Sequence, residues 1–218
     1  MKKQFLITAA VLVAGFAPAS KAGNLLLNGG FELTNNGYSE TLTPVDWTNV
    51  GHIDGVIAYS VFNTPAYDGN YFYDLGGYGQ ALPNSGDGIE QTVTTSVGAQ
   101  YALVFGMSNE NVGGHGPDYL NVLINGSLLQ TYLMVVNGSY GELGLPFTTQ
   151  TLSYTATSTS STIEFTVTGS DLGYDDPMID GISFSPASSS VPEPATWFGC
   201  AIGLGVIAAR YRRSLSRK

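Results

Sequence analysis

The sequence has 218 residues, with 8 Lys and Arg against 17 Asp and Glu, and a single cysteine. The cations lie at positions 2, 3, 21, 210, 212, 213, 217 and 218, so residues 22–209 contain none. This excludes nucleic-acid binding and polybasic attachment to anionic lipid for the central part, because both depend on Lys and Arg. Cys200 has no partner for a disulfide, so the stability of about 165 central residues must come from one packed core.

The N-terminal residues 1–22 are predicted to be a secretory signal peptide. Lys2 and Lys3 precede the largely apolar run 5–17, and small residues stand at positions 20 and 22. A charged start, an apolar run and a small-residue exit in this order are typical of a leader. We therefore expect signal peptidase to cut after Ala22.

Short alternating or β-branched runs recur along the chain and predict an all-β domain over residues 23–186. Asn125 and Gly126 accept positive φ at both central positions of a tight turn, so 119–135 is expected to be a hairpin. Ten short strands in one domain indicate an antiparallel jelly-roll sandwich. The expected strands are 25–27, 56–62, 71–75, 89–95, 101–107, 119–124, 128–135, 151–157, 162–168 and 179–184.

The opening residues 24–32, NLLLNGGFE, resemble the start of galactose-binding-like jelly rolls, which include many carbohydrate-binding modules. Residues 68–75, 88–105 and 177–184 are similar, in the same order, to the plant and bacterial cell-wall family called domain of unknown function 642. The closing residues PMIDGISF depart from that family's pattern, because Gly181 stands where a second acid is usual. The resemblance implies a galactose-binding-like fold and a carbohydrate-binding-like function without catalysis.

This resemblance also implies a structural calcium ion between the first and last strands. Its ligands would be the carboxylates of Glu32 and Asp180, with the Gly30 carbonyl as a further candidate. Calcium takes roughly six to eight oxygen ligands, and a cation would relieve the repulsion among acids that have no Lys or Arg to pair with. The alternative is that both acids are ordinary solvated carboxylates at strand ends.

The residues expected of an enzyme are poorly represented. His52 and His115 lie beside glycines, and there is neither a G-x-S-x-G nor an H-E-x-x-H motif, so we expect neither a serine hydrolase nor a zinc site. An acidic loop before Asp180 offers carboxylates for a glycosidase or a second metal, although a solvated loop is the preferred interpretation. The cluster consists of Asp171, Asp175 and Asp176 together with Asp180.

Binding of carbohydrate is the better supported function. The chain has 13 Tyr and 2 Trp, whose flat faces and polar edges suit stacking on sugar rings. Trp47 is expected in the core and not at a ligand. A matrix or adhesion protein without a small ligand is the alternative, and the threonines of 148–168 leave an ice-binding face as a distant one.

The C-terminal residues 191–218 resemble the PEP-CTERM sorting signal, which an exosortase handles. The motif is Val191, Pro192, Glu193 and Pro194; an uncharged run over 195–209 and a basic end follow it. That run is short for a span of about 20 residues, but the basic cluster favours a membrane segment with its C-terminus in the cytoplasm. The resemblance implies cleavage near the motif and display, beyond a linker at 187–190, on the surface or in the exopolysaccharide matrix of a Gram-negative bacterium.

Overall fold

The structure is a computed structural model, and it describes residues 23–34, 43–51, 56–58, 64–76, 85–109, 118–134, 146–169 and 177–187. These residues belong to one compact unit, Ala22–Ala187. The predicted signal peptide, sorting motif and membrane segment at 195–209 lie outside the described residues. Within the described ranges, no helix is long and apolar enough to cross a bilayer.

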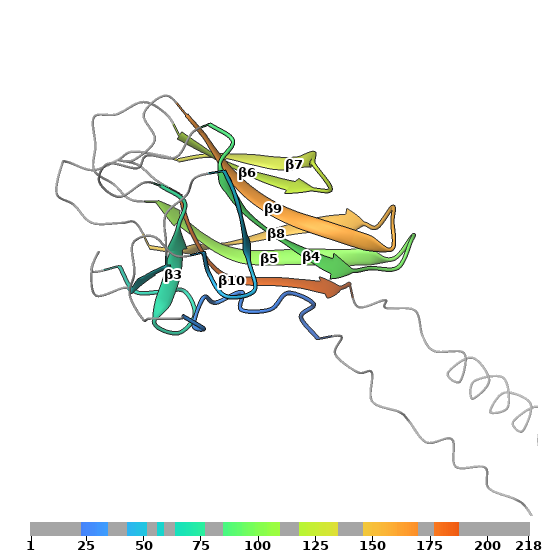
Figure 1. Ribbon diagram of the computed structural model, residues 1–218, viewed down its shortest axis with the longest axis horizontal. Coiled ribbons are helices and arrows are strands. Elements are labelled where there is room, and N and C mark those ends of the chain that lie inside the picture. Colours follow the sequence, from blue (N-terminus) through green and yellow to red (C-terminus); the bar gives the residue numbers. More distant parts are fainter. Residues whose placement is uncertain are drawn as a thin grey trace, which may run out of the picture. The chain divides into compact units, whose positions relative to one another are not determined.

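Ten antiparallel strands form two five-stranded sheets (Figure 1). Sheet A has the order β1-β4-β9-β6-β7 and sheet B the order β2-β3-β10-β5-β8, so the chain passes repeatedly from one sheet to the other. The described ranges contain no helix, which confirms the all-β prediction. The strands are β1 Thr48–Val50, β2 Val56–Ala58, β3 Tyr71–Asp74, β4 Gly88–Thr94, β5 Gln100–Asn109, β6 Asp118–Ile124, β7 Ser127–Leu133, β8 Thr148–Thr155, β9 Ser160–Gly169 and β10 Pro177–Pro186.

The core lies between the two sheets. Every second residue of β6 and of the first half of β9 is buried, because successive side chains of a strand point to opposite faces. Phe105 of β5 meets Phe165 of β9 edge to face at 5.1 Å between ring centroids, and this contact joins the sheets. All residues of the main core fall between Leu26 and Phe184, so this part of the chain supplies its own core.

The predicted hairpin is confirmed, and one predicted strand is wrong. Asn125 and Gly126 have φ values of 53° and 70° and form the turn between β6 and β7. Residues 25–27 form no strand, and bends lie at 26–28, although this segment runs beside β10 (Figure 1). Within the described ranges, two backbone hydrogen bonds join residues 25–29 to β10, Leu25 N to Phe184 O and Ile182 N to Gly29 O, which is too few for a ladder. The sequence prediction also missed the short strand β1.

Candidate functional site

The opening segment, residues 24–32, ties together parts of the domain that are distant in sequence, and we name it the opening clasp. The Asn24 amide accepts from Phe184 N at 2.8 Å and donates to Ile182 O at 3.1 Å, so it pairs with β10 as a backbone would. The Asn28 amide donates to Val45 O at 2.9 Å. Both asparagines of the opening motif are therefore structural.

Glu32 ends the clasp and holds the loop before β3. Its Oε1 atom accepts hydrogen bonds from Asn70 N at 2.6 Å and Tyr71 N at 2.8 Å. Gly69 has a φ of 72°, which favours glycine, and a Cβ atom there would displace this carboxylate from its hydrogen bonds. Glu32 is exposed, and its predicted role as an edge acid and its predicted role as a metal ligand both remain compatible with this position.

Asp180 holds the same loop from the other side and has no exposed surface. Its Oδ2 atom accepts from Asp68 N at 2.8 Å and its Oδ1 atom from Gly181 N at 2.6 Å. The pKa of Asp180 is raised to about 7, mainly because the carboxyl group is buried; backbone N–H donors oppose this shift, and the nearby Asp68 carboxylate adds to it. No Lys or Arg of the domain is available to pair with it.

The structure therefore brings the predicted calcium ligands to one loop, residues 67–71. Gly30 also lies there, because a Cβ atom built on it would be 3.2 Å from Asp68 Oδ2. Oxygen donors of the type that calcium prefers thus contact the same loop, and Asp68 is one that sequence reasoning missed although it precedes a Gly-Asn turn. However, the part of the chain that the structure describes has no group of three Asp, Glu, His or Cys side chains placed to hold a metal.

A second cluster of polar groups covers the outer face of sheet A. Glu90 of β4 and Glu164 of β9 are direct cross-strand partners, and both are half-buried. Burial raises the pKa of Glu164, and the like charge of Glu90 raises it further. Beside this pair, the hydroxyl groups of Thr92 and Thr162 are 2.8 Å apart.

The same face continues across β6 and β7 as a chain of hydrogen bonds. Thr131 Oγ1 donates to Asn121 Oδ1 at 2.7 Å, and Asn121 Nδ2 donates to Thr168 Oγ1 at 3.0 Å. Tyr119 is the cross-strand partner of Thr168 and places an aromatic ring at the end of this chain. We name this surface the sheet A polar face: Glu90, Thr92, Tyr119, Asn121, Thr131, Thr162, Glu164 and Thr168.

Of the other residues for which the sequence predicted a role, one prediction is confirmed, and several of the residues lie outside the described ranges. Trp47 is 5% exposed, donates from Nε1 to Asn28 O at 3.1 Å and packs against Phe31, so it is a core residue as predicted. His52 and His115 lie outside the described residues. The acidic loop does too, with Asp171, Asp175 and Asp176.

No protein-family model and no curated protein matches the sequence. Among solved structures, the chain is similar to the carbohydrate-binding module TmCBM61 in complex with β-1,4-galactotriose, at 17% identity over 75% of this chain and 99% of that one, with a TM-score of 0.46. It is also similar to the CBM22-1 xylan-binding domain of Paenibacillus barcinonensis Xyn10C, at 20% identity over 79% and 100%, with a TM-score of 0.44.

A third similar structure is the K1 cleaved adhesin domain of Lys-gingipain from Porphyromonas gingivalis W83, at 10% identity over 67% of this chain and 94% of that one, with a TM-score of 0.47. These three structural neighbours are thus two carbohydrate-binding modules and an adhesin domain, and a further one is the enzymatically active domain of the bacteriophage CBA120 tailspike protein 4. At these identities and TM-scores, the similarity carries no argument about a ligand or a site of this chain.

The buried Asp180 predicts how the stability of the metal-free domain depends on pH. Its pKa is about 7 when folded and about 4 when unfolded, so the folded state holds the extra proton between these values. Stability should therefore fall as pH rises from 4 to 7, by up to about 1.4 kcal/mol per unit, and level off above 7. Urea unfolding of residues 23–187 in EGTA measures this.

Asp68→Asn removes the neighbouring charge and should move the fall in stability to lower pH. Asp46→Asn removes an exposed acid at another loop and serves as the matched control. A pH profile that Asp68→Asn and Asp46→Asn change equally would contradict the assignment to Asp180.

Proposed function

We propose that the chain is an exported, non-catalytic carbohydrate-binding domain that acts at the cell surface or in the exopolysaccharide matrix. The observation that carries this proposal is the sheet A polar face. It presents hydroxyl, amide and carboxylate groups from four neighbouring strands, and several are held by hydrogen bonds to one another. Sugars offer hydroxyl groups in closely spaced series, and such a surface can both donate to and accept from them.

The charge of the domain restricts the ligand class. Acids without any Lys or Arg repel anionic polymers, so the expected ligand is a neutral polysaccharide. Tyr119 is half-buried at one end of the polar face and offers a flat apolar surface for the carbon-bound hydrogens of a sugar ring. Preformed hydrogen bonds among Thr131, Asn121 and Thr168 reduce the ordering cost of binding.

The proposal predicts that residues 23–187 bind neutral polymers such as β-1,4-galactan or xylan in preference to polygalacturonate. The double variant Asn121→Leu, Thr131→Val should weaken binding roughly tenfold. The reason is that two hydrogen bonds between the protein and the sugar, of about 0.5–1.5 kcal/mol each, are lost. Affinity electrophoresis and titration calorimetry measure the difference.

Gln100→Leu is the matched control, because it removes an exposed side-chain amide from β5 in the other sheet. Equal losses in the control and the double variant, at unchanged melting temperature, would show that the polar face is not the binding surface.

A second candidate function rests on the Glu90 and Glu164 pair. Directly opposed residues of an antiparallel sheet have Cβ atoms roughly 5 Å apart, so the flexible side chains of Glu90 and Glu164 can bring their carboxyl groups to the separation of about 5–5.5 Å that retaining glycosidases use. The raised pKa of Glu164 would suit a general acid. Release of reducing ends that both Glu90→Gln and Glu164→Gln abolish would establish hydrolysis, whereas binding without release supports the non-catalytic domain.

We also propose a structural calcium ion at the loop 67–71, held by Glu32 and Asp180 with the Gly30 carbonyl and water. Two features support it: a fully buried carboxylate without a cation beside it, and a third acid, Asp68, on the same loop. An ion there would join the opening clasp to β10 and would neutralise these acids.

Calcium should therefore stabilise the folded domain by mass action. A hundredfold excess over Kd contributes about 2.7 kcal/mol. This corresponds to a rise in Tm of roughly 5–10 °C for a domain of this size. Glu32→Gln should remove most of this rise, and the control Asp46→Asn should keep it. A Tm that neither EGTA nor millimolar calcium changes would rule the ion out.

Export and sorting complete the proposal, with signal peptidase and an exosortase as the partners during secretion. The support is the order of the terminal signals in the sequence, from Lys2 to Ala22 and from Val191 to the basic end. Intact-mass measurement of surface protein should find both ends removed. Replacing Pro192, Glu193 and Pro194 by alanine should retain the protein in the inner membrane, whereas surface protein that keeps residues 210–218 would identify the tail as a permanent anchor.

A further inference from the structure

The outer face of sheet B carries a track of small side chains along β5. Val104 lies opposite Ser183 of β10 on one side and Thr151 of β8 on the other. Two residues earlier, Ala102 lies between Ser185 and Ser153 in the same way. At each of these two positions, an apolar side chain of β5 thus lies between a hydroxyl group of β10 and a hydroxyl group of β8. We name this surface the β5 track: Ala102, Val104, Gly106, Thr149, Thr151, Ser153, Ser183 and Ser185.

Tyr67 closes one end of the track by lying over two glycines. A Cβ atom built on Gly106 would be 2.5 Å from Tyr67 Cγ, and one built on Gly181 would be 2.6 Å from Cδ1. Gly181 also has a φ of 57°, which strains other residues. The ring therefore occupies the space that side chains would fill on two neighbouring strands, and only glycine at both positions permits this.

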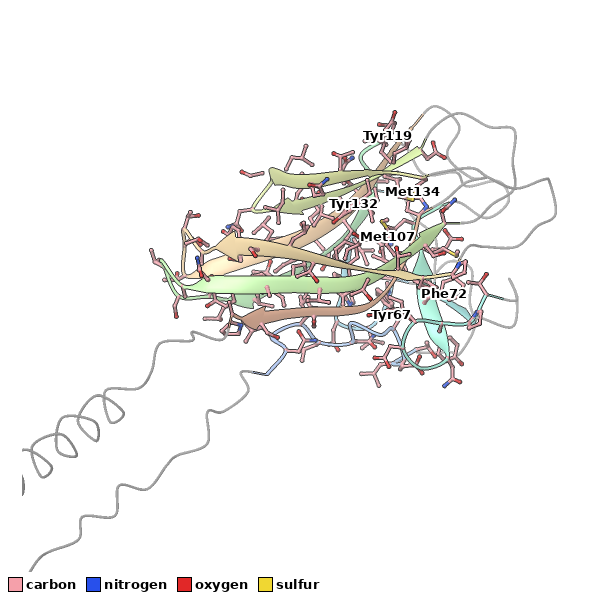
Figure 2. The ribbon with its side chains drawn as sticks, turned by 180° about the vertical axis from the view of Figure 1, so that it is seen from behind. Tyr67, Phe72, Met107, Tyr119, Tyr132 and Met134 are labelled. Atoms are coloured by element: carbon pink, nitrogen blue, oxygen red, sulfur yellow. The ribbon has the colours of Figure 1, made fainter. Side chains whose placement is uncertain are left out.

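The ring is fixed and yet open to solvent. Its hydroxyl group is 2.8 Å from Thr149 Oγ1, and its ring centroid is 6.3 Å from that of Phe147. The backbone beside it is held by the hydrogen bond from Asp68 N to Asp180. Even so, Tyr67 is 41% exposed, and it is the one aromatic residue among the exposed large apolar side chains of the described ranges. Figure 2 shows Tyr67 and Tyr119 at opposite sides of the sandwich.

We propose that the β5 track is a second saccharide-binding site, with Tyr67 as its stacking platform, so that one domain holds two glycan chains on opposite faces. The ligand class rests on the function proposed above; the site itself rests on sheet B alone. The apolar side chains of β5 lie between hydroxyl groups of β8 and β10. This arrangement matches a sugar chain, whose rings have apolar faces and hydroxyl groups at their edges. No residue of the track is charged, which again favours a neutral chain.

The dimensions and rigidity of the track agree with this ligand. Alternate residues of a strand are about 7 Å apart, so the positions from Ala102 to Gly106 span about 14 Å, the length of two or three sugar rings. A side chain that is already ordered loses little freedom when it binds. A protein partner would need a broader contiguous apolar patch, and here only Val104 and Tyr67 contribute large apolar groups.

The test uses residues 23–187 with β-1,4-galactohexaose and xylohexaose as probes in titration calorimetry. We expect two sites per domain, and Tyr67→Leu should leave one, because leucine still covers the glycines but offers no ring. Tyr67→Phe loses only the hydrogen bond to Thr149 and should keep both sites. Wild-type protein should also cross-link soluble galactan or xylan into turbid aggregates, and Tyr67→Leu should not. Leu128→Ala, at a residue 61% exposed on the other sheet, is the matched control.

The outcomes separate this proposal from the one above. If Asn121→Leu with Thr131→Val abolishes all binding while Tyr67→Leu changes neither stoichiometry nor cross-linking, the β5 track is not a saccharide site. If Tyr67→Leu removes the only site and the sheet A variant has no effect, the track stands and the polar face fails. Binding of neither probe overturns both, and a shift from dimer to monomer in Tyr67→Leu would instead identify the track as a contact between two copies.

Discussion

Neutral hydrogen bonds from the opening clasp hold the two ends of this domain together, and the rest of the structure depends on them. The domain has no disulfide and no Lys or Arg, so covalent links and conventional ion pairs are unavailable. In their place, Asn24 pairs with β10, and Gln91 of β4 accepts from Leu27 N at 2.8 Å and donates to Leu27 O at 3.0 Å. Each such bond stabilises the folded state by about 1 kcal/mol, so several of them together are needed to hold the two ends of the domain.

The fold followed from the sequence wherever local pattern and tertiary structure agreed. Alternation predicted the strands of the hairpin, and Asn125 with Gly126 predicted its turn, because those residue types tolerate the positive φ that the turn requires. Residues 25–27 were mistaken for a strand because three leucines satisfy the same burial pattern as a strand while their backbone is held by side-chain amides. The local sequence pattern cannot show whether the backbone N–H groups of a segment bond to a neighbouring strand or to side-chain amides.

The candidate sites were less accessible to sequence reasoning, since each depends on register between strands. The motif resemblance indicated Glu32 and Asp180, and in the structure both accept hydrogen bonds from the loop 67–71, but Asp68 joins them only through folding. Glu90 and Glu164 are 74 positions apart, and nothing in the sequence pairs them before β4 and β9 align. Likewise, the sequence did not explain why glycine replaces the second acid of the motif at position 181. The structure gives the reason, because the Tyr67 ring lies over Gly181 and leaves no room for a side chain.

Several of these acids work against stability. A buried carboxylate without a cation and two glutamates held side by side both cost free energy, and proteins keep such arrangements where function needs them. Asp180 accepts hydrogen bonds from the backbone of Tyr67, Asp68 and Gly181, yet its pKa remains raised because burial outweighs them. The cost of these acids is consistent with the binding roles proposed for them, since they contribute little to folding.

The edge strand β8 has a further consequence for how the protein behaves when it is crowded. Its sequence, TTQTLSYT, contains no charge and no proline, and these are the usual means by which sheet edges avoid pairing with one another. The domain has no lysine to place there, and its net negative charge is a feature that keeps neighbouring copies apart. Acidification or divalent cations would weaken that repulsion, and the colloidal stability of the protein at high local concentration is thus set by the ionic composition of its surroundings.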